Sequence, residues 1–152
     1  MKTLTFQIQI DSPASHVYEQ MLGLRDKQSY ERWTALFDPS STYEGDWAKG
    51  SKIYFLSKDQ EGKKHGMVAI VKENIPNEYV SVSHIGFIDG DQEVQIESED
   101  PNWGEMLENY TFTEQNGTTT VDVRVDADDK YVDYFNTAWV LALEKLKADC
   151  EK

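Results

Sequence analysis

Residues 131–150 read YVDYFNTAWVLALEKLKADC, and this stretch decides the fold class. Its apolar residues recur at spacings of three and four, which is the pattern of one buried face of an α-helix. They are Tyr131, Tyr134, Phe135, Ala138, Trp139, Ala142, Leu143 and Leu146. The carboxylates of Asp126, Asp128 and Asp129 come just before it and suit a helix N-terminus. We therefore expect a long helix to close the chain.

Upstream of that helix, from about residue 42 to residue 125, the chain consists of short β-type runs separated by turn residues. The expected strands are Lys52–Ser57, His65–Glu73, Tyr79–Ile88, Gly90–Glu97, Glu105–Glu114 and Thr118–Val125. Asn116-Gly117 is the strongest hairpin signal between them. This texture is typical of an antiparallel meander.

The first residues alternate between apolar and polar, with Leu4, Phe6, Ile8 and Ile10 on one face, and predict a strand. Ser12-Pro13 stops it and begins a short amphipathic helix that ends near Gly23. A second short helix is expected over residues 26–37.

These elements predict one α+β domain over residues 1–152. Its expected form is a curved antiparallel sheet of six or seven strands around a long C-terminal helix, with two short helices after the first strand.

Charge limits the partners of this domain, because 28 acidic and 15 basic residues leave a formal net charge of −13. Such a surface repels phosphate backbones and anionic headgroups, so we expect no nucleic-acid binding and no membrane insertion. Cys150 is the one cysteine, which excludes an internal disulfide and favours a reducing compartment. No signal-peptide core follows Met1, and we expect a cytoplasmic protein.

The order of the expected elements resembles the helix-grip (SRPBCC) superfamily, which includes START lipid-transfer domains and the birch-pollen allergens. Particular motifs look like the branch named after the activator of heat-shock-protein ATPase. They are Trp33-x3-Phe37, Tyr43-Glu44-Gly45-Asp46-Trp47-x2-Gly50, Ile53-Tyr54-Phe55, Gly66-Met67-Val68, Ile75-Pro76, Tyr110-Thr111-Phe112 and Trp139-x2-Ala142-Leu143. The resemblance implies a deep apolar cavity between sheet and helix. It carries over no catalytic residue and no cofactor.

Two polar residues share the parity of the inward apolar positions in their strands. His84 follows Val80 and Val82, and Glu108 lies between Met106 and Tyr110, so both are expected to face the cavity. A buried carboxylate needs a partner or a raised pKa, and His84 is the candidate partner of Glu108. The pair can orient a ligand or serve only as a structural pair, and a β-bulge near Gly86 or Gly104 would turn one of them outward. His16, His65 and His84 lack metal-ligand spacing, so no metal is expected.

The other expected ligand contacts are apolar and mostly aromatic. Aromatic residues at strand or helix spacing also occur in close-packed cores that hold no ligand. Together with His84 and Glu108 they are Trp33, Phe37, Tyr43, Trp47, Phe55, Met67, Tyr110, Phe112, Tyr131, Phe135 and Trp139.

Three functions compete at this point. The first is binding of a small, largely apolar molecule in the cavity. The second is a small enzyme of the cyclase, dehydratase or hydrolase type that uses Glu108, His84 and Tyr110 for proton transfer. The third is a co-chaperone-like domain with a protein partner, for which the acidic surface would meet a basic one.

Overall fold

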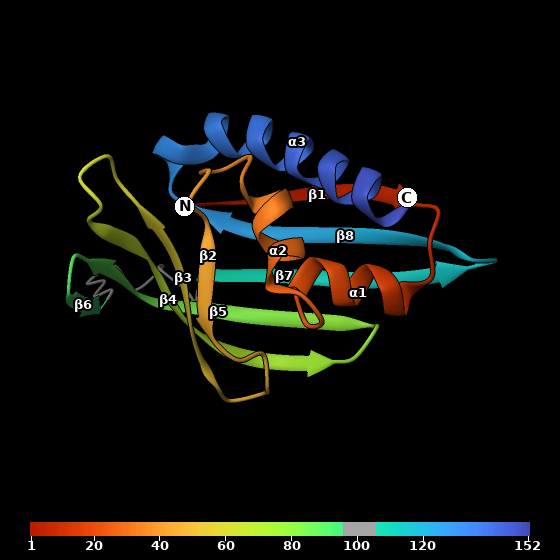
Figure 1. Ribbon diagram of the computed structural model, residues 1–152, viewed down its shortest axis with the longest axis horizontal. Helices are drawn as coiled ribbons and strands as arrows, with labels where there is room; N and C mark the ends of the chain where they lie inside the picture. Colours follow the sequence, from red (N-terminus) through yellow and green to blue (C-terminus); the bar gives the residue numbers. More distant parts are fainter. Residues whose placement is uncertain (96–105) are drawn as a thin grey trace.

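A computed structural model describes residues 1–95 and 106–152. Its elements are β1 (Lys2–Ile10), α1 (Ala14–Leu22), α2 (Lys27–Thr34), β2 (Thr42–Gly45), β3 (Lys52–Lys58), β4 (Lys64–Ile75), β5 (Tyr79–Asp89), β6 (Gln92–Gln95), β7 (Met106–Gln115), β8 (Thr118–Ala127), the 3-10 turn η1 (Asp129–Tyr131) and α3 (Val132–Cys150). Figure 1 shows the long α3 lying along β1, with α1 and α2 in front of the sheet. The α+β helix-grip architecture expected from the sequence is confirmed.

All the strands belong to one antiparallel sheet in the order β1-β8-β7-β5-β4-β3-β2, and β6 pairs with β5. Within residues 1–95 and 106–152 the sheet has 8 strands, more than the six or seven expected, because the short β2 gave no alternating signal. The hairpin at Asn116-Gly117 is confirmed. Both residues have positive φ, 55° and 80°, as the tight turn between β7 and β8 requires.

Helix boundaries differ from the expectation at one point. Asp26 caps α2 by accepting a hydrogen bond from the backbone N–H of Gln28, but the helix ends at Thr34 and does not reach Phe37. The chain from Ala35 onward turns, so Phe37 is free to point toward the space between sheet and helix. The expected strand residues Ile96, Glu97 and Glu105 lie outside the described residues.

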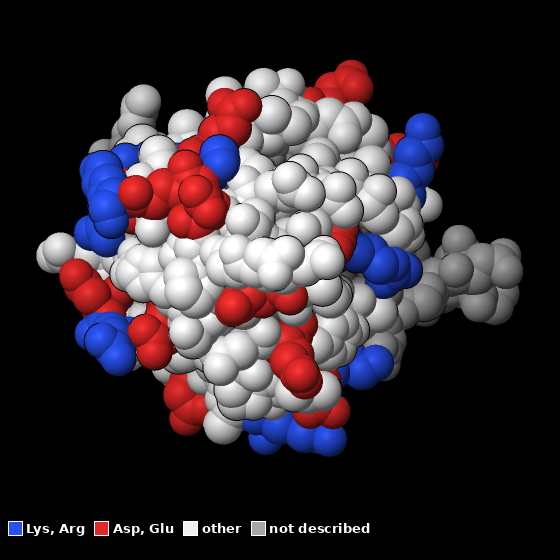
Figure 2. All heavy atoms as spheres, turned by 90° about the vertical axis from the view of Figure 1, so that its right-hand side faces the viewer, with Lys and Arg blue, Asp and Glu red and all other residues white. Residues whose placement is uncertain are grey.

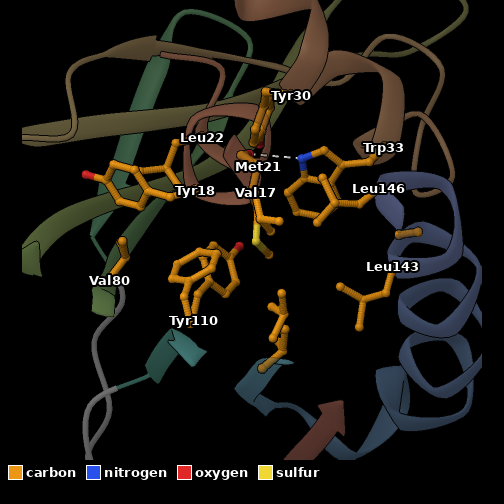
Figure 3. Packing of buried hydrophobic residues seen from close by; sticks show 14 of the residues in the cluster. Val17, Tyr18, Met21, Leu22, Tyr30, Trp33, Val80, Tyr110, Leu143 and Leu146 are labelled. Atoms are coloured by element: carbon orange, nitrogen blue, oxygen red, sulfur yellow. Dashed lines mark hydrogen bonds between the residues drawn. The ribbon is translucent and has the colours of Figure 1, made fainter. Parts of the chain in front are cut away.

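The core joins the three helices to the sheet. Figure 3 shows Met21 of α1, Trp33 of α2, Tyr110 of β7 and Leu146 of α3 converging, and its dashed line is the bond from Trp33 Nε1 to the carbonyl oxygen of Met21. At the end of α3 the Cys150 thiol is buried as well. Its pKa is raised to about 12, first by burial and then by the carboxylates of Asp149 and Glu151.

Three aromatic side chains hold the C-terminal end of α1. The last carbonyls of a helix have no intrahelical partner and need other donors. Trp33 Nε1 donates to Met21, Trp47 Nε1 to Leu22 and the Tyr43 hydroxyl to Gly23, at 2.9, 3.0 and 3.2 Å. The rings that fix α1 to the rest of the fold therefore also satisfy its backbone.

Candidate functional site

A cavity of about 380 Å³ lies between the sheet, α2 and α3. Strands β3, β4, β5, β7 and β8 supply one wall, and α2 with the turn after it and the start of α3 supply the other. Most of its surface is apolar, and aromatic rings make up much of the wall. This form, with a few polar groups in an apolar wall, is the usual form of a small-molecule site.

Most of the residues expected at a ligand site line this cavity. They are Trp33, Phe37, Phe55, Met67, His84, Glu108, Tyr110, Tyr131, Phe135 and Trp139. The ring of Trp139 is 4% exposed and lies within 6.1 Å, centroid to centroid, of the rings of Phe6 and Tyr110. It contacts Trp33 and Phe37 as well, so one side chain of α3 holds sheet and helices together at the cavity wall.

Tyr43, Trp47 and Phe112 do not line the cavity, contrary to expectation. Tyr43 and Trp47 are buried with their polar atoms bonded to the end of α1, and Phe112 packs edge-on against Tyr18 at 5.8 Å. These three rings belong to the core: Phe112 packs under α1, and Tyr43 and Trp47 pack on each other and donate to the end of α1.

Sequence reasoning missed other lining residues. They are Tyr30, Thr34, Ser41, Met106, Val125, Asp126, Asp128 and Tyr134. Tyr134 belongs to the apolar stripe predicted for the C-terminal helix. Its place at the side of that stripe was the feature of the sequence that could have indicated a cavity-lining residue. Asp126 and Asp128 were interpreted only as helix-terminus charges, which gave no indication that they border a cavity.

His84 and Glu108 meet at the cavity wall. In the pairing of β5 with β7, His84 lies opposite Met106 and Glu108 opposite Val82, so the two are diagonal neighbours on one face. The distance from His84 Nε2 to Glu108 Oε1 is 3.5 Å. The pairing of β4 with β5 leaves Ile85 without an opposite residue, and this irregularity comes after His84, so the parity from Val80 to His84 is kept. Gly104 lies outside the described residues.

Tyr110 completes this polar group. Its hydroxyl donates a hydrogen bond to Glu108 Oε2 from two residues further along β7. Burial raises the pKa of Tyr110 well above 10.0, and the nearby Glu108 carboxylate raises it further. The pKa of Tyr30 is raised well above 10.0 by the same two causes in the same order. Both phenols therefore stay neutral at physiological pH, and that of Tyr110 donates to Glu108.

His84 has spare hydrogen-bonding capacity. Its side chain is 10% exposed, and Nδ1 has no hydrogen-bond partner within residues 1–95 and 106–152. Nε2 lies beside Glu108, so Nδ1 is the ring nitrogen left for a ligand. An unpaired polar atom in such a place is unfavourable until a partner arrives.

The outer surface carries the acidic excess of the chain. On the face shown in Figure 2, acidic side chains are scattered among uncharged ones, and Lys and Arg lie mostly near its outline. No continuous basic surface appears on that face of the described residues. None of the helices within residues 1–95 and 106–152 is long and apolar enough to cross a membrane.

Comparison with solved structures shows the same fold in several bacterial proteins. A protein from Chromobacterium violaceum is 18% identical over 99% of this chain and 97% of its own, with a TM-score of 0.68. A protein from Mycobacterium smegmatis is 18% identical over 96% of this chain and 88% of its own, with a TM-score of 0.68. The Aha1 dimer from Colwellia psychrerythraea is 19% identical over 99% of this chain and 97% of its own, with a TM-score of 0.64.

No curated protein sequence matches the chain. The family described as Activator of Hsp90 ATPase homolog 1-like protein matches residues 11–151, which include the cavity, the helices and nearly all of the sheet. The chain belongs to the Activator of Hsp90 ATPase homolog 1-like family.

Proposed function

We propose that this protein binds a small, largely apolar molecule in the cavity between the sheet and α3. The observation that carries the proposal is the cavity itself. Its volume of about 380 Å³ falls within the range of roughly 300–1,000 Å³ that small-molecule sites occupy. Its lining is mostly apolar with a few polar groups, as in such sites.

The polar group of His84, Glu108 and Tyr110 is the orienting end of the proposed site. The apolar wall supplies affinity by removing the ligand from water, and a few fixed polar atoms select its orientation. All three residues lie on neighbouring strands of one sheet, which gives them a rigid support.

A fluorescent apolar probe tests the proposal. N-phenyl-1-naphthylamine is uncharged near neutral pH and gains fluorescence on leaving water, so titration into the protein reports cavity binding. We expect saturable binding that weakens at least fivefold in Phe135→Ala, because Phe135 lines the cavity. Leu141→Ala on the same helix is the control, because Leu141 is exposed and lies away from the cavity. Equal binding by both variants and the parent protein would place the probe elsewhere.

Native mass spectrometry of protein purified under mild conditions addresses the natural ligand. We expect a second species heavier than the apoprotein by the mass of one small molecule, and its loss in Phe135→Ala. Absence of any probe binding together with absence of such a species would refute the proposed function.

A second candidate function is proton-transfer catalysis in the same cavity. It is favoured by the contact of a carboxylate with an imidazole and a phenol, since such groups serve as general acids and bases when a substrate lies within reach. If the molecule carried through purification is chemically altered on incubation with protein, and Glu108→Gln stops that change, catalysis replaces simple binding.

A further inference from the structure

The ionisable groups that line the cavity are unequal in sign. Glu108, Asp126 and Asp128 are lining carboxylates, and His84 is the one lining side chain able to carry positive charge within the described residues. No Lys or Arg lines the cavity there, and residues 96–105 contain neither residue type. A carboxylate or phosphate headgroup would therefore enter an acidic space without a Lys or Arg to receive it.

Asp126 and Asp128 already have partners of their own. Asp126 accepts hydrogen bonds from the backbone N–H of Leu107 at 3.0 Å and from the hydroxyl of Thr3 at 2.7 Å, and Arg124 lies 3.5 Å away. Asp128 caps the turn η1 through the N–H of Lys130 at 3.1 Å. These two carboxylates contribute negative charge to the cavity, but their main contacts are internal.

Glu108 differs from them because its contacts leave acceptor capacity unused. Its side chain is 22% exposed, and its partners within the described residues are the Tyr110 hydroxyl and, at the long distance of 3.5 Å, His84 Nε2. A carboxylate has about four acceptor sites. Charge held among apolar rings interacts strongly with an opposite charge, because the surroundings screen little.

At the polar end of the cavity, Glu108 keeps spare acceptor sites, and Nδ1 of His84 has no hydrogen-bond partner within the described residues. A protonated amine offers donors and a positive charge to the same small region, and aromatic rings nearby attract cations through their π faces. Building on the proposed function, we infer that the ligand is an apolar or aromatic molecule carrying a protonated amine, and that Glu108 receives the ammonium group.

Three probes with one naphthalene body separate the possibilities. 1-Naphthylmethylamine, 1-naphthalenemethanol and 1-naphthoic acid carry a cation, a neutral hydroxyl and an anion, and isothermal titration calorimetry at pH 7.5 gives the affinity of each. We expect the amine to bind about tenfold more tightly than the alcohol, which is about 1.4 kcal/mol, since a hydrogen bond between charged partners is stronger than a neutral one. The acid should bind most weakly.

Glu108→Gln tests the assigned residue, because glutamine keeps the volume and can still accept from Tyr110. We expect the amine to lose its tenfold advantage while the affinity of the alcohol changes less than about twofold. Glu144→Gln is the control, since it removes the same charge from an exposed position on α3 outside the cavity. Circular dichroism and the urea midpoint verify that both variants fold.

A measurement on the parent protein keeps the test independent of the variant. Added salt should weaken the binding of the amine modestly and leave the binding of the alcohol nearly unchanged, because Glu108 is 22% exposed and salt screens a partly buried charge pair less than an exposed one. If the acid binds as tightly as the amine, or if the amine keeps its advantage in Glu108→Gln, the inference is wrong and cavity binding still stands. If none of the three naphthalenes binds while N-phenyl-1-naphthylamine does, the inference is wrong and cavity binding still stands.

Discussion

The hydroxyl of Tyr134 donates a hydrogen bond of 2.7 Å to the backbone carbonyl oxygen of Phe37. Tyr134 belongs to the first turns of α3 and Phe37 to the turn after α2, so the bond joins two segments of the cavity wall that faces the sheet. Tyr134 is 46% exposed, which places the bond where the cavity meets solvent. The Tyr134 hydroxyl therefore adds a hydrogen bond at the entrance to the ring contacts of Phe37 with Tyr134, Phe135 and Trp139.

Tyr134→Phe removes that hydroxyl and keeps the ring. We expect the dissociation rate of bound N-phenyl-1-naphthylamine, measured by stopped-flow fluorescence, to rise severalfold, because the entrance loses its bridging bond. The free energy of unfolding should fall by about 1 kcal/mol or less, since the bond is exposed. Tyr131→Phe is the control, because no hydrogen bond of the Tyr131 hydroxyl is found in the described part of the chain. Equal dissociation rates for both variants would show that the bond does not restrain exchange.

Trp139→Ala should lower the free energy of unfolding by about 3–5 kcal/mol, because the ring is buried and its loss leaves a cavity among four aromatic neighbours. Urea denaturation followed by circular dichroism measures the change. The adjacent Val140 is exposed, and Val140→Ala should cost less than about 0.5 kcal/mol. A denaturation midpoint unchanged by Trp139→Ala would mean that α3 docks in another way.

Trp47→Phe tests the carbonyl contacts at the end of α1. The indole N–H donates to the carbonyl oxygen of Leu22, and its removal leaves a buried acceptor unpaired. We expect a loss of about 1–3 kcal/mol in the free energy of unfolding and faster amide exchange in the last turn of α1. Tyr43→Phe should cost less, because its bond to Gly23 is longer at 3.2 Å. A greater loss in Tyr43→Phe would contradict this ranking.

Alkaline pH should destabilise the protein through its buried phenols. The pKa of Tyr30 is raised well above 10.0 in the folded state, chiefly by burial, so the unfolded chain loses this proton at lower pH. Stability from this group is complete below pH 10 and falls as pH rises toward the folded pKa, by up to about 1.4 kcal/mol per pH unit. Urea denaturation at pH 9 and pH 11 measures the free energy of unfolding at each pH. Its fall between the two pH values should be smaller for Tyr30→Phe than for the parent protein. For Tyr131→Phe, at an exposed position, the free energy of unfolding should fall by as much as for the parent protein.

The fold was predictable because its signals are periodic. The stripe from Tyr131 to Leu146 recurs over several turns, and only a helix with one buried face produces such a repeat. Strand β2 and the early end of α2 were not predicted, because both features are short. The four residues of β2 are too few to establish an alternation, and the turn that ends α2 before Phe37 has no proline or glycine to mark it.

The candidate site was predictable in part. The alternation of residues along each strand predicted that His84 and Glu108 face the cavity. This holds for His84 because the irregularity of β5 comes after it. It holds for Glu108 because no register shift interrupts β7 where it pairs with β5 and β8. Tyr43 and Trp47 were misassigned because an aromatic residue carries no sign in the sequence of whether it faces a void or a neighbouring helix. That distinction depends on where α1 lies, which is a property of the folded chain.

The burial of Cys150 determines how the protein can be labelled. A thiol with a pKa of about 12 is almost entirely protonated at neutral pH and reacts slowly with maleimides and with oxidants, because the thiolate is the nucleophile. It is also the only cysteine in the sequence. A cysteine introduced at an exposed position near the entrance would therefore carry a fluorophore selectively, with Cys150 left in place. Entry and exit of small molecules could then be followed in single-molecule fluorescence on a protein that differs from the parent at one residue.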